Sequence, residues 1–94
     1  MDERLVQLSL KIINLMRSFG FECGDYVVLI HPKEYYHVEV VLYKRGQRKL
    51  HDMGLNEWKL LDEIGKIVQE HFPEDVRKVV TISLDDAEAI IIHE

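Results

Sequence analysis

The first nineteen residues carry apolar side chains at the spacing of an amphipathic helix. These side chains recur every three or four residues, which is the period of one helix face. They are Leu5, Leu8, Ile12, Leu15, Met16 and Phe19. Asp2 is suited to cap the start of a helix over residues 2–19, and Gly20 to end it in a left-handed conformation. Because Val6 and Ile13 widen this apolar stripe, we expect the helix to contact more than one other element.

Two strand-like segments follow this helix. Residues 26–31 are apolar on both faces, as in a buried strand, and Pro32 begins a break in the chain. Residues 35–45 alternate between apolar and polar side chains, with Tyr36, Val38, Val40 and Leu42 on one face. The pattern predicts an antiparallel hairpin. A turn at Gly46-Gln47 favours a further short strand over residues 48–53.

A second amphipathic helix is predicted over residues 56–72. Asn56 is a suitable N-cap, and Pro73 ends the segment. The apolar stripe is formed by Trp58, Leu61, Ile64, Val68 and Phe72, with Leu60 and Ile67 beside it. Gly65 lies at the edge of this stripe, which predicts that another element approaches the helix closely there.

The C-terminal segment predicts a second hairpin, with strands over residues 76–84 and 87–93 around Asp85-Asp86. One face of the hairpin is apolar and includes Val80, Ile82 and Leu84. The other face is only partly polar. Val79, Ile90 and Ile92 lie on that second face, and we expect them to be contacts with another copy of the chain.

These elements predict one α+β domain over residues 1–94. It has two helices packed on a mainly antiparallel sheet, in the order α-β-β-(β)-α-β-β. Two helices cover only one face of such a sheet, and this leaves the second face for a homodimer contact. The order resembles that of the type III secretion chaperones, which are small, acidic and dimeric. The resemblance concerns element order alone, and no residue or function is carried over.

The amino-acid composition limits the classes of partner that the protein can bind. The formal net charge is −5, with 17 acidic and 12 basic side chains, which weighs against generic nucleic-acid binding. Cys23 is the only cysteine, so the chain can form no internal disulfide and no thiolate zinc cluster. The sequence shows no signal peptide and no apolar run of membrane-spanning length. We therefore expect a cytoplasmic protein without a membrane partner. The few Asn and Gln side chains suggest a thermophilic source.

One cluster of basic residues offers an alternative function. Residues 44–49 contain four cations next to Tyr43, namely Lys44, Arg45, Arg48 and Lys49. A basic turn beside an aromatic side chain can contact a phosphate backbone, so these four residues are candidate nucleic-acid contacts. Basic residues at strand edges also prevent edge-to-edge aggregation, and this second interpretation is compatible with the acidic total.

The histidines offer another alternative. His31 and His37 flank the predicted turn and can approach each other, with Glu39 as a third metal ligand. None of the histidines has the spacing of a known metal motif. His51 and Asp52 are adjacent, and in an extended segment they would point to opposite faces. Acidic neighbours of Cys23 disfavour its thiolate. We therefore expect no catalytic residue, no metal and no cofactor.

The sequence thus favours a non-catalytic, homodimeric interaction or assembly protein that presents a largely acidic surface to an unidentified protein partner. A nucleic-acid-binding module using residues 44–49 is the first alternative. A small metal-binding protein or enzyme built from the histidines is the second.

Overall fold

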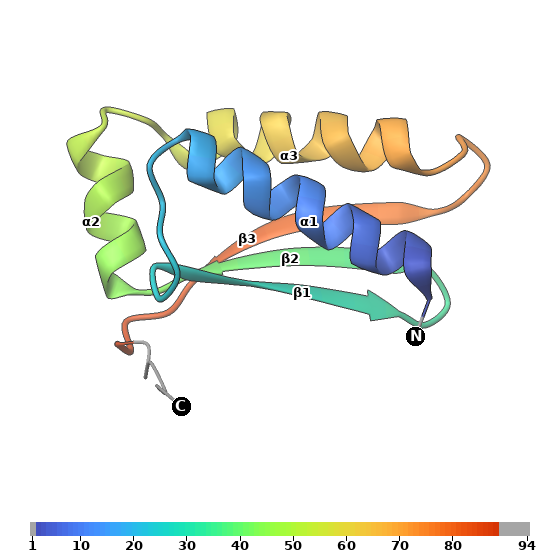
Figure 1. The fold of residues 1–94 in the computed structure, drawn as a ribbon, viewed down its shortest axis with the longest axis horizontal. Coiled ribbons are helices and arrows are strands. Elements are labelled where there is room, and N and C mark those ends of the chain that lie inside the picture. The colour runs from blue at the N-terminus through green and yellow to red at the C-terminus, as the bar shows by residue number, and fades with distance from the viewer. Residues whose placement is uncertain (1, 89–94) are drawn as a thin grey trace.

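The computed structural model describes residues 2–88, and it shows an α+β fold with three helices and a three-stranded mixed sheet (Figure 1). The order is α-β-β-α-α-β. The elements are α1 (Glu3–Ser18), β1 (Tyr26–Pro32), β2 (Tyr36–Leu42), α2 (Lys44–Asp52), α3 (Glu57–His71) and β3 (Lys78–Leu84). No helix within this described part of the chain is long and apolar enough to cross a bilayer.

The predicted ends of the two long helices are confirmed. The Asp2 carboxylate accepts a hydrogen bond from the backbone N–H of Arg4 at 2.9 Å, and Gly20 follows α1 with a φ of 95°. At α3, the Asn56 side chain accepts from the N–H of Lys59, also at 2.9 Å. These contacts satisfy N–H groups that have no partner inside the helix.

The sheet has the order β1-β2-β3, so β2 is the central strand. The predicted hairpin of β1 and β2 is confirmed as antiparallel, with Val28 opposite Val40. The expectation of a mainly antiparallel sheet is wrong, because β3 pairs parallel to β2, with Ile82 beside Val40. A parallel pair requires a long crossover, and α2 and α3 provide it.

The segment read as a basic turn and a short strand is instead helix α2. Residues 48–53 therefore do not form a strand, and the turn predicted at Gly46-Gln47 lies inside the helix. Leu50 and Gly46 are its buried residues, four positions apart on one face. The Gln47 amide also donates 2.9 Å hydrogen bonds to the carbonyls of Leu42 and Asp85. The helix thus ties together the ends of β2 and β3.

Within residues 2–88, β3 pairs with β2. Asp85 donates its N–H to the Leu42 carbonyl at 2.9 Å, and Ala87 accepts from Lys44 at 3.3 Å. Residues 85–87 therefore contact the end of β2 and the start of α2. Most of the strand predicted over residues 87–93, including Ile90 and Ile92, lies outside the described residues.

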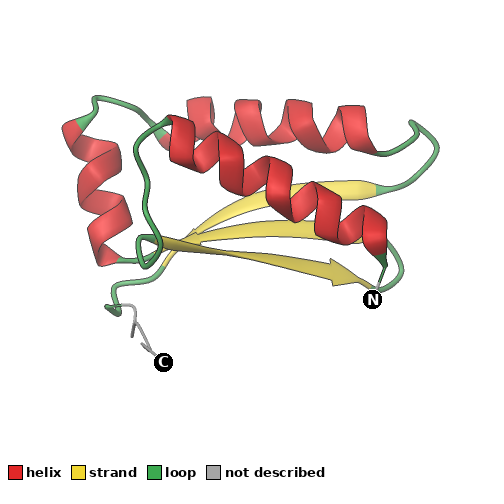
Figure 2. Ribbon diagram, viewed as in Figure 1, coloured by secondary structure: helices red, strands yellow, loops and turns green. Residues whose placement is uncertain are grey.

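Both long helices lie on the same face of the sheet, with α1 over β1 and α3 over β3 (Figures 1 and 2). The core lies in this layer and buries twelve apolar side chains. They are Leu8, Ile12, Met16, Phe21, Val38, Val40, Leu42, Leu50, Leu60, Ile64, Val68 and Phe72. As expected, two helices cover one face only, and no element within residues 2–88 covers the opposite face.

Trp58 does not belong to the buried stripe of α3, as the sequence had suggested. Its exposed fraction is 75%, whereas Leu60, Ile64 and Val68 are buried. The buried stripe of α3 is centred on Ile64, and Trp58 precedes Ile64 by six residues. At about 100° per residue, Trp58 therefore points about 120° away from the centre of the stripe. The first turn of α3 therefore presents an indole to solvent.

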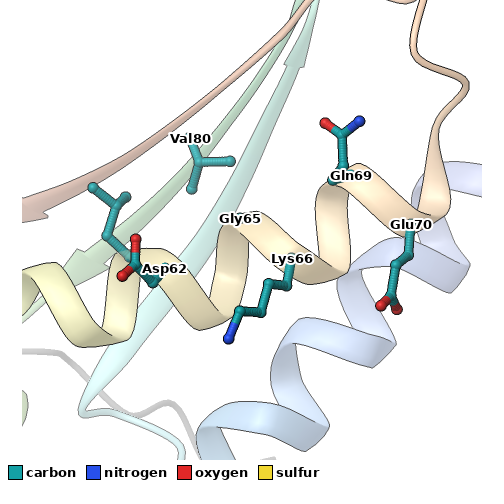
Figure 3. A pocket seen from close by; sticks show the side chains of 7 residues that line it. Asp62, Gly65, Lys66, Gln69, Glu70 and Val80 are labelled. Carbon is teal, nitrogen blue, oxygen red and sulfur yellow. The ribbon is translucent and has the colours of Figure 1, made fainter.

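Gly65 is not a point of close approach, which corrects the sequence-based interpretation. A Cβ at this position would have no atom within 4 Å other than its immediate surroundings in the helix. Gly65 instead opens a cavity of about 500 Å³ between α3 and β3, on the side of the helix that faces Val80 (Figure 3).

We expect Gly65→Ala to stabilise the protein by about 0.5–1 kcal/mol. Alanine restricts the unfolded backbone and favours the helix, and the space for its methyl group is already present. Urea unfolding monitored by circular dichroism measures the change. A loss of stability would mean that the space beside Gly65 is filled by another group.

Candidate interaction surface

The uncovered face of the sheet, called here the open face, presents three side chains from each strand. The strand registers align them in three rows across the sheet. The rows are Val27, Val41 and Ser83; Leu29, Glu39 and Thr81; and His31, His37 and Val79. The face is therefore mixed, with apolar side chains surrounding a small polar network.

The polar side chains of the open face contact one another. The Ser83 hydroxyl donates to Glu39 Oε2 at 2.5 Å, and His31 Nε2 lies 3.5 Å from Glu39 Oε1. The hydrogen bond from Ser83 and the contact with His31 hold the pKa of Glu39 below its ordinary value. His37 Nε2 lies 2.7 Å from the hydroxyl of Thr81. Such paired polar groups cost less to bury than unpaired ones.

The outer edge of β1 adjoins this face and lacks charge. Residues 26–30 (Tyr-Val-Val-Leu-Ile) contain no ionisable group other than the Tyr26 phenol. No strand within residues 2–88 pairs with the outer edge of β1. Along this edge lies a groove of about 720 Å³ between β1 and α1, lined by apolar side chains such as Ile13 and Val28 and by the charged side chains Arg17 and Glu22. Residues 26–30 of the β1 edge are an association-prone feature, because native edge strands normally carry charges or prolines that block pairing, and the one proline of β1, Pro32, is its last residue.

Comparisons with protein-family models, curated proteins and solved structures found no match.

Two of the four candidate nucleic-acid contacts are ion-paired inside the chain. Lys49 Nζ lies 2.7 Å from Oδ2 of Asp25, and Arg45 Nε lies 3.0 Å from Oδ1. The Arg45 contact is an ion pair rather than an aligned hydrogen bond. Both cations also approach Glu22. Arg45 and Lys49 thus hold α2 against the segment that precedes β1.

Asp25 is fully buried, and its carboxylate is the centre of this ion-pair cluster. Burial is the largest single influence on the pKa of Asp25 and raises it. The hydrogen bond from Lys49, the hydrogen bond from the N–H of Glu22 at 2.7 Å, and the charges of Lys49 and Arg45 together outweigh burial and hold this pKa below its ordinary value. A buried carboxylate with several partners stays ionised at neutral pH.

Lys44 and Arg48 occupy another side of α2. They line a shallow pocket with Gln47 and His51, and two carboxylates, Asp52 and Asp86, line it as well. All four cations of residues 44–49 therefore lie close to carboxylates of the same chain. Half of them contact acidic groups of the same chain, and the other half share their pocket with carboxylates.

The histidines are placed in three different surroundings. As predicted, His31 and His37 meet across the hairpin, with ring centroids 5.2 Å apart. His51 and Asp52 approach to 3.6 Å on α2, contrary to the expectation for an extended segment, and both side chains are largely exposed. His71 links α3 to α1 through the Arg4 carbonyl at 2.7 Å and Lys11 at 3.2 Å.

Among residues 2–88, no group of three or more His, Cys, Asp or Glu side chains converges as a metal site. Glu39 contacts His31 Nε2 and not the space between the two rings, so it does not act as the third ligand considered from sequence. Cys23 is exposed and lines the groove beside β1.

Of the three predicted dimer contacts, only Val79 is described. It lies on the open face with an exposed fraction of 38%. Sequence reasoning missed Asp25 and the β1 edge. The absence of charge over residues 26–30 indicates an association-prone edge only when β1 is known to be an edge strand of the sheet. No local pattern indicated that Asp25 is buried, because its charged partners, Arg45 and Lys49, lie about twenty residues further along the chain.

Proposed function

We propose that the protein is a non-catalytic interaction protein that works as a homodimer, in which the β1 edges of two copies pair in antiparallel fashion. One observation carries this proposal: β1 is a seven-residue edge strand whose residues 26–30 contain no charge. Pairing satisfies the outward backbone groups of β1, and it removes an edge that is otherwise a liability for aggregation.

The two edges of the sheet differ in a way that favours β1. The opposite edge strand, β3, begins with Lys78 and carries Thr81 and Ser83 on the open face. The corresponding positions of β1 are Leu29 and Val27, which are apolar. A second copy that pairs with β1 therefore gains apolar cross-strand contacts without desolvating a charged side chain.

The groove between α1 and β1 supports the same arrangement. Its volume is about 720 Å³, and the apolar part of its lining accommodates side chains of an added strand, although Arg17 and Glu22 line it as well. In a second copy the side chains on the helix-covered face of β1 are Tyr26, Val28 and Ile30, which also pack against the core of their own chain. One two-fold contact at the β1 edge covers the grooves of both copies.

Light scattering with a matched pair of variants tests the proposal. Leu29 and Val79 both have an exposed fraction of 38% on the open face, but they belong to opposite edge strands. We expect the wild-type chain to show twice the mass of one chain at micromolar concentration. Leu29→Lys should raise the dimer dissociation constant about tenfold or more, because a lysine on each β1 places like charges at the contact. Val79→Lys should leave the constant unchanged.

Three results would contradict this arrangement. A monomer throughout the micromolar range removes the homodimer. Equal weakening by both lysine variants places the contact on the open face rather than at the β1 edge. Weakening by Val79→Lys alone places it at β3.

A further inference from the structure

We propose that His31 and His37 form a binding site for a divalent transition-metal ion, Zn²⁺ or Cu²⁺, through their Nδ1 atoms, with water in the remaining coordination positions. Both histidines belong to one chain, so the site does not depend on the proposed homodimer. It lies at the hairpin end of the open face, where the two residues are directly opposite each other in β1 and β2.

The separation of the two rings fits a shared ion. Imidazole nitrogens bind Zn²⁺ at about 2.0–2.1 Å, so two ring centroids around one tetrahedral ion lie about 5 Å apart. The observed centroid distance is 5.2 Å, with a tilt of 36° between the rings. A pocket of about 350 Å³, lined by His31, Lys33, Tyr35 and His37, leaves room for an ion and its waters.

The Nε2 atoms of both rings lie beside oxygen atoms of the kind that metal-binding histidines use as partners. His37 Nε2 is within hydrogen-bond distance of the Thr81 hydroxyl, at 2.7 Å, whereas His31 Nε2 lies 3.5 Å from the Glu39 carboxylate, which is an ion-pair contact and not a hydrogen bond. When a ring donates Nε2–H to an oxygen, its lone pair lies on Nδ1. Within residues 2–88, neither Nδ1 forms a hydrogen bond, and both rings line the same pocket. The pair therefore offers two ring nitrogens beside one pocket.

The pocket has both negative and positive charges around it, and their effects on a bound cation and on a bound anion differ in sign. Glu39 supplies a negative charge beside His31, and its position is fixed by Ser83. Lys33 lines the pocket and repels a cation, whereas it would attract an oxyanion. The Arg77 guanidinium lies 4.9 Å from the ring centroid of Tyr35, over the ring. Removing the Lys33 charge therefore has opposite effects on the two kinds of ligand.

The test titrates the chelator-treated full-length protein with Zn²⁺ and, separately, with Cu²⁺. Competition with a chromogenic chelator measures the affinity, and nitrogen-detected NMR of the histidine rings identifies the binding atom. We expect Zn²⁺ to shift the Nδ1 resonances of His31 and His37. His31→Ala and His37→Ala should each weaken binding at least tenfold, whereas His51→Ala, at an exposed histidine of α2, should not.

Two further variants keep both histidines and test the site even if the histidine variants fail to fold. Glu39→Gln should weaken Zn²⁺ binding by about 10–100-fold, because it removes the carboxylate behind His31. Lys33→Ala should strengthen it. Binding that survives both histidine variants, or that occurs only at other histidines, overturns the proposal. The proposal is also overturned if the two rings respond to inorganic phosphate and not to Zn²⁺, and if Lys33→Ala weakens that phosphate binding.

Discussion

Gly46→Ala is expected to lower the free energy of unfolding by about 3 kcal/mol, because the added methyl group clashes with the backbone of Asp25. A Cβ at Gly46 would overlap the carbonyl oxygen of Asp25, and that oxygen also accepts the N–H of Tyr43 at 2.9 Å. Neither group can move without separating α2 from the segment before β1. The clash exceeds the helix preference of alanine, which is worth about 1 kcal/mol in the opposite direction.

Gly65→Ala is the matched control, because it adds the same methyl group to the other helical glycine, where space is available. Urea unfolding of both variants gives the comparison directly. The two substitutions are expected to have opposite signs. Equal effects would show that helix preference, and not the approach to Asp25, determines the stability of α2.

Asp25→Asn is the second substitution with a large expected effect, again about 3 kcal/mol of lost stability. Removing one member of a buried ion pair leaves its partners uncompensated. An asparagine would turn amide hydrogens toward Arg45 or Lys49 in place of a carboxylate oxygen. Asp62→Asn, at an exposed position of α3, makes the same chemical change and should have little effect.

The same carboxylate determines part of the response to acid. Because the pKa of Asp25 is lowered in the folded state, the unfolded state binds its proton first as the pH falls. The stabilisation is complete above the unfolded pKa, near pH 4, and is lost as the pH falls through the folded pKa. Glu39, whose pKa is also lowered, contributes with the same sign.

Unfolding free energies measured from pH 7 down to pH 2 should therefore decrease for the wild-type chain and decrease less for Asp25→Asn. Parallel curves for the two proteins would contradict the assignment of acid sensitivity to Asp25.

The sequence predicted those elements whose signal is local. The apolar period from Leu8 to Met16, and the alternation from Tyr36 to Leu42, identified a helix and a strand with correct buried faces. Val80 and Ile82 were also placed on the better-buried side of their strand. In each case, burial of a regular row of apolar side chains decided the structure, and neighbouring residues are sufficient to reveal such a row.

The elements that the sequence misassigned depend on distant partners. Helix α2 has one large buried side chain, Leu50, and is otherwise held by Gly46 against Asp25 and by ion pairs. No apolar period marks such a helix. For β3, no local pattern indicated the pairing with β2. That strand lies about forty residues earlier, and a parallel pairing leaves no local trace.

The parallel position of β3 also has a kinetic consequence. During synthesis, α1, β1 and β2 emerge well before β3, which must wait for the whole crossover of α2 and α3. Until then, β2 is itself an edge strand, and Val38, Val40 and Leu42 lack a neighbour on one side. Pairing across such a sequence separation is slow compared with hairpin formation. A β1–β2 hairpin that forms before β3 has two unpaired edges, and unpaired strand edges in an incomplete chain are prone to association with other chains.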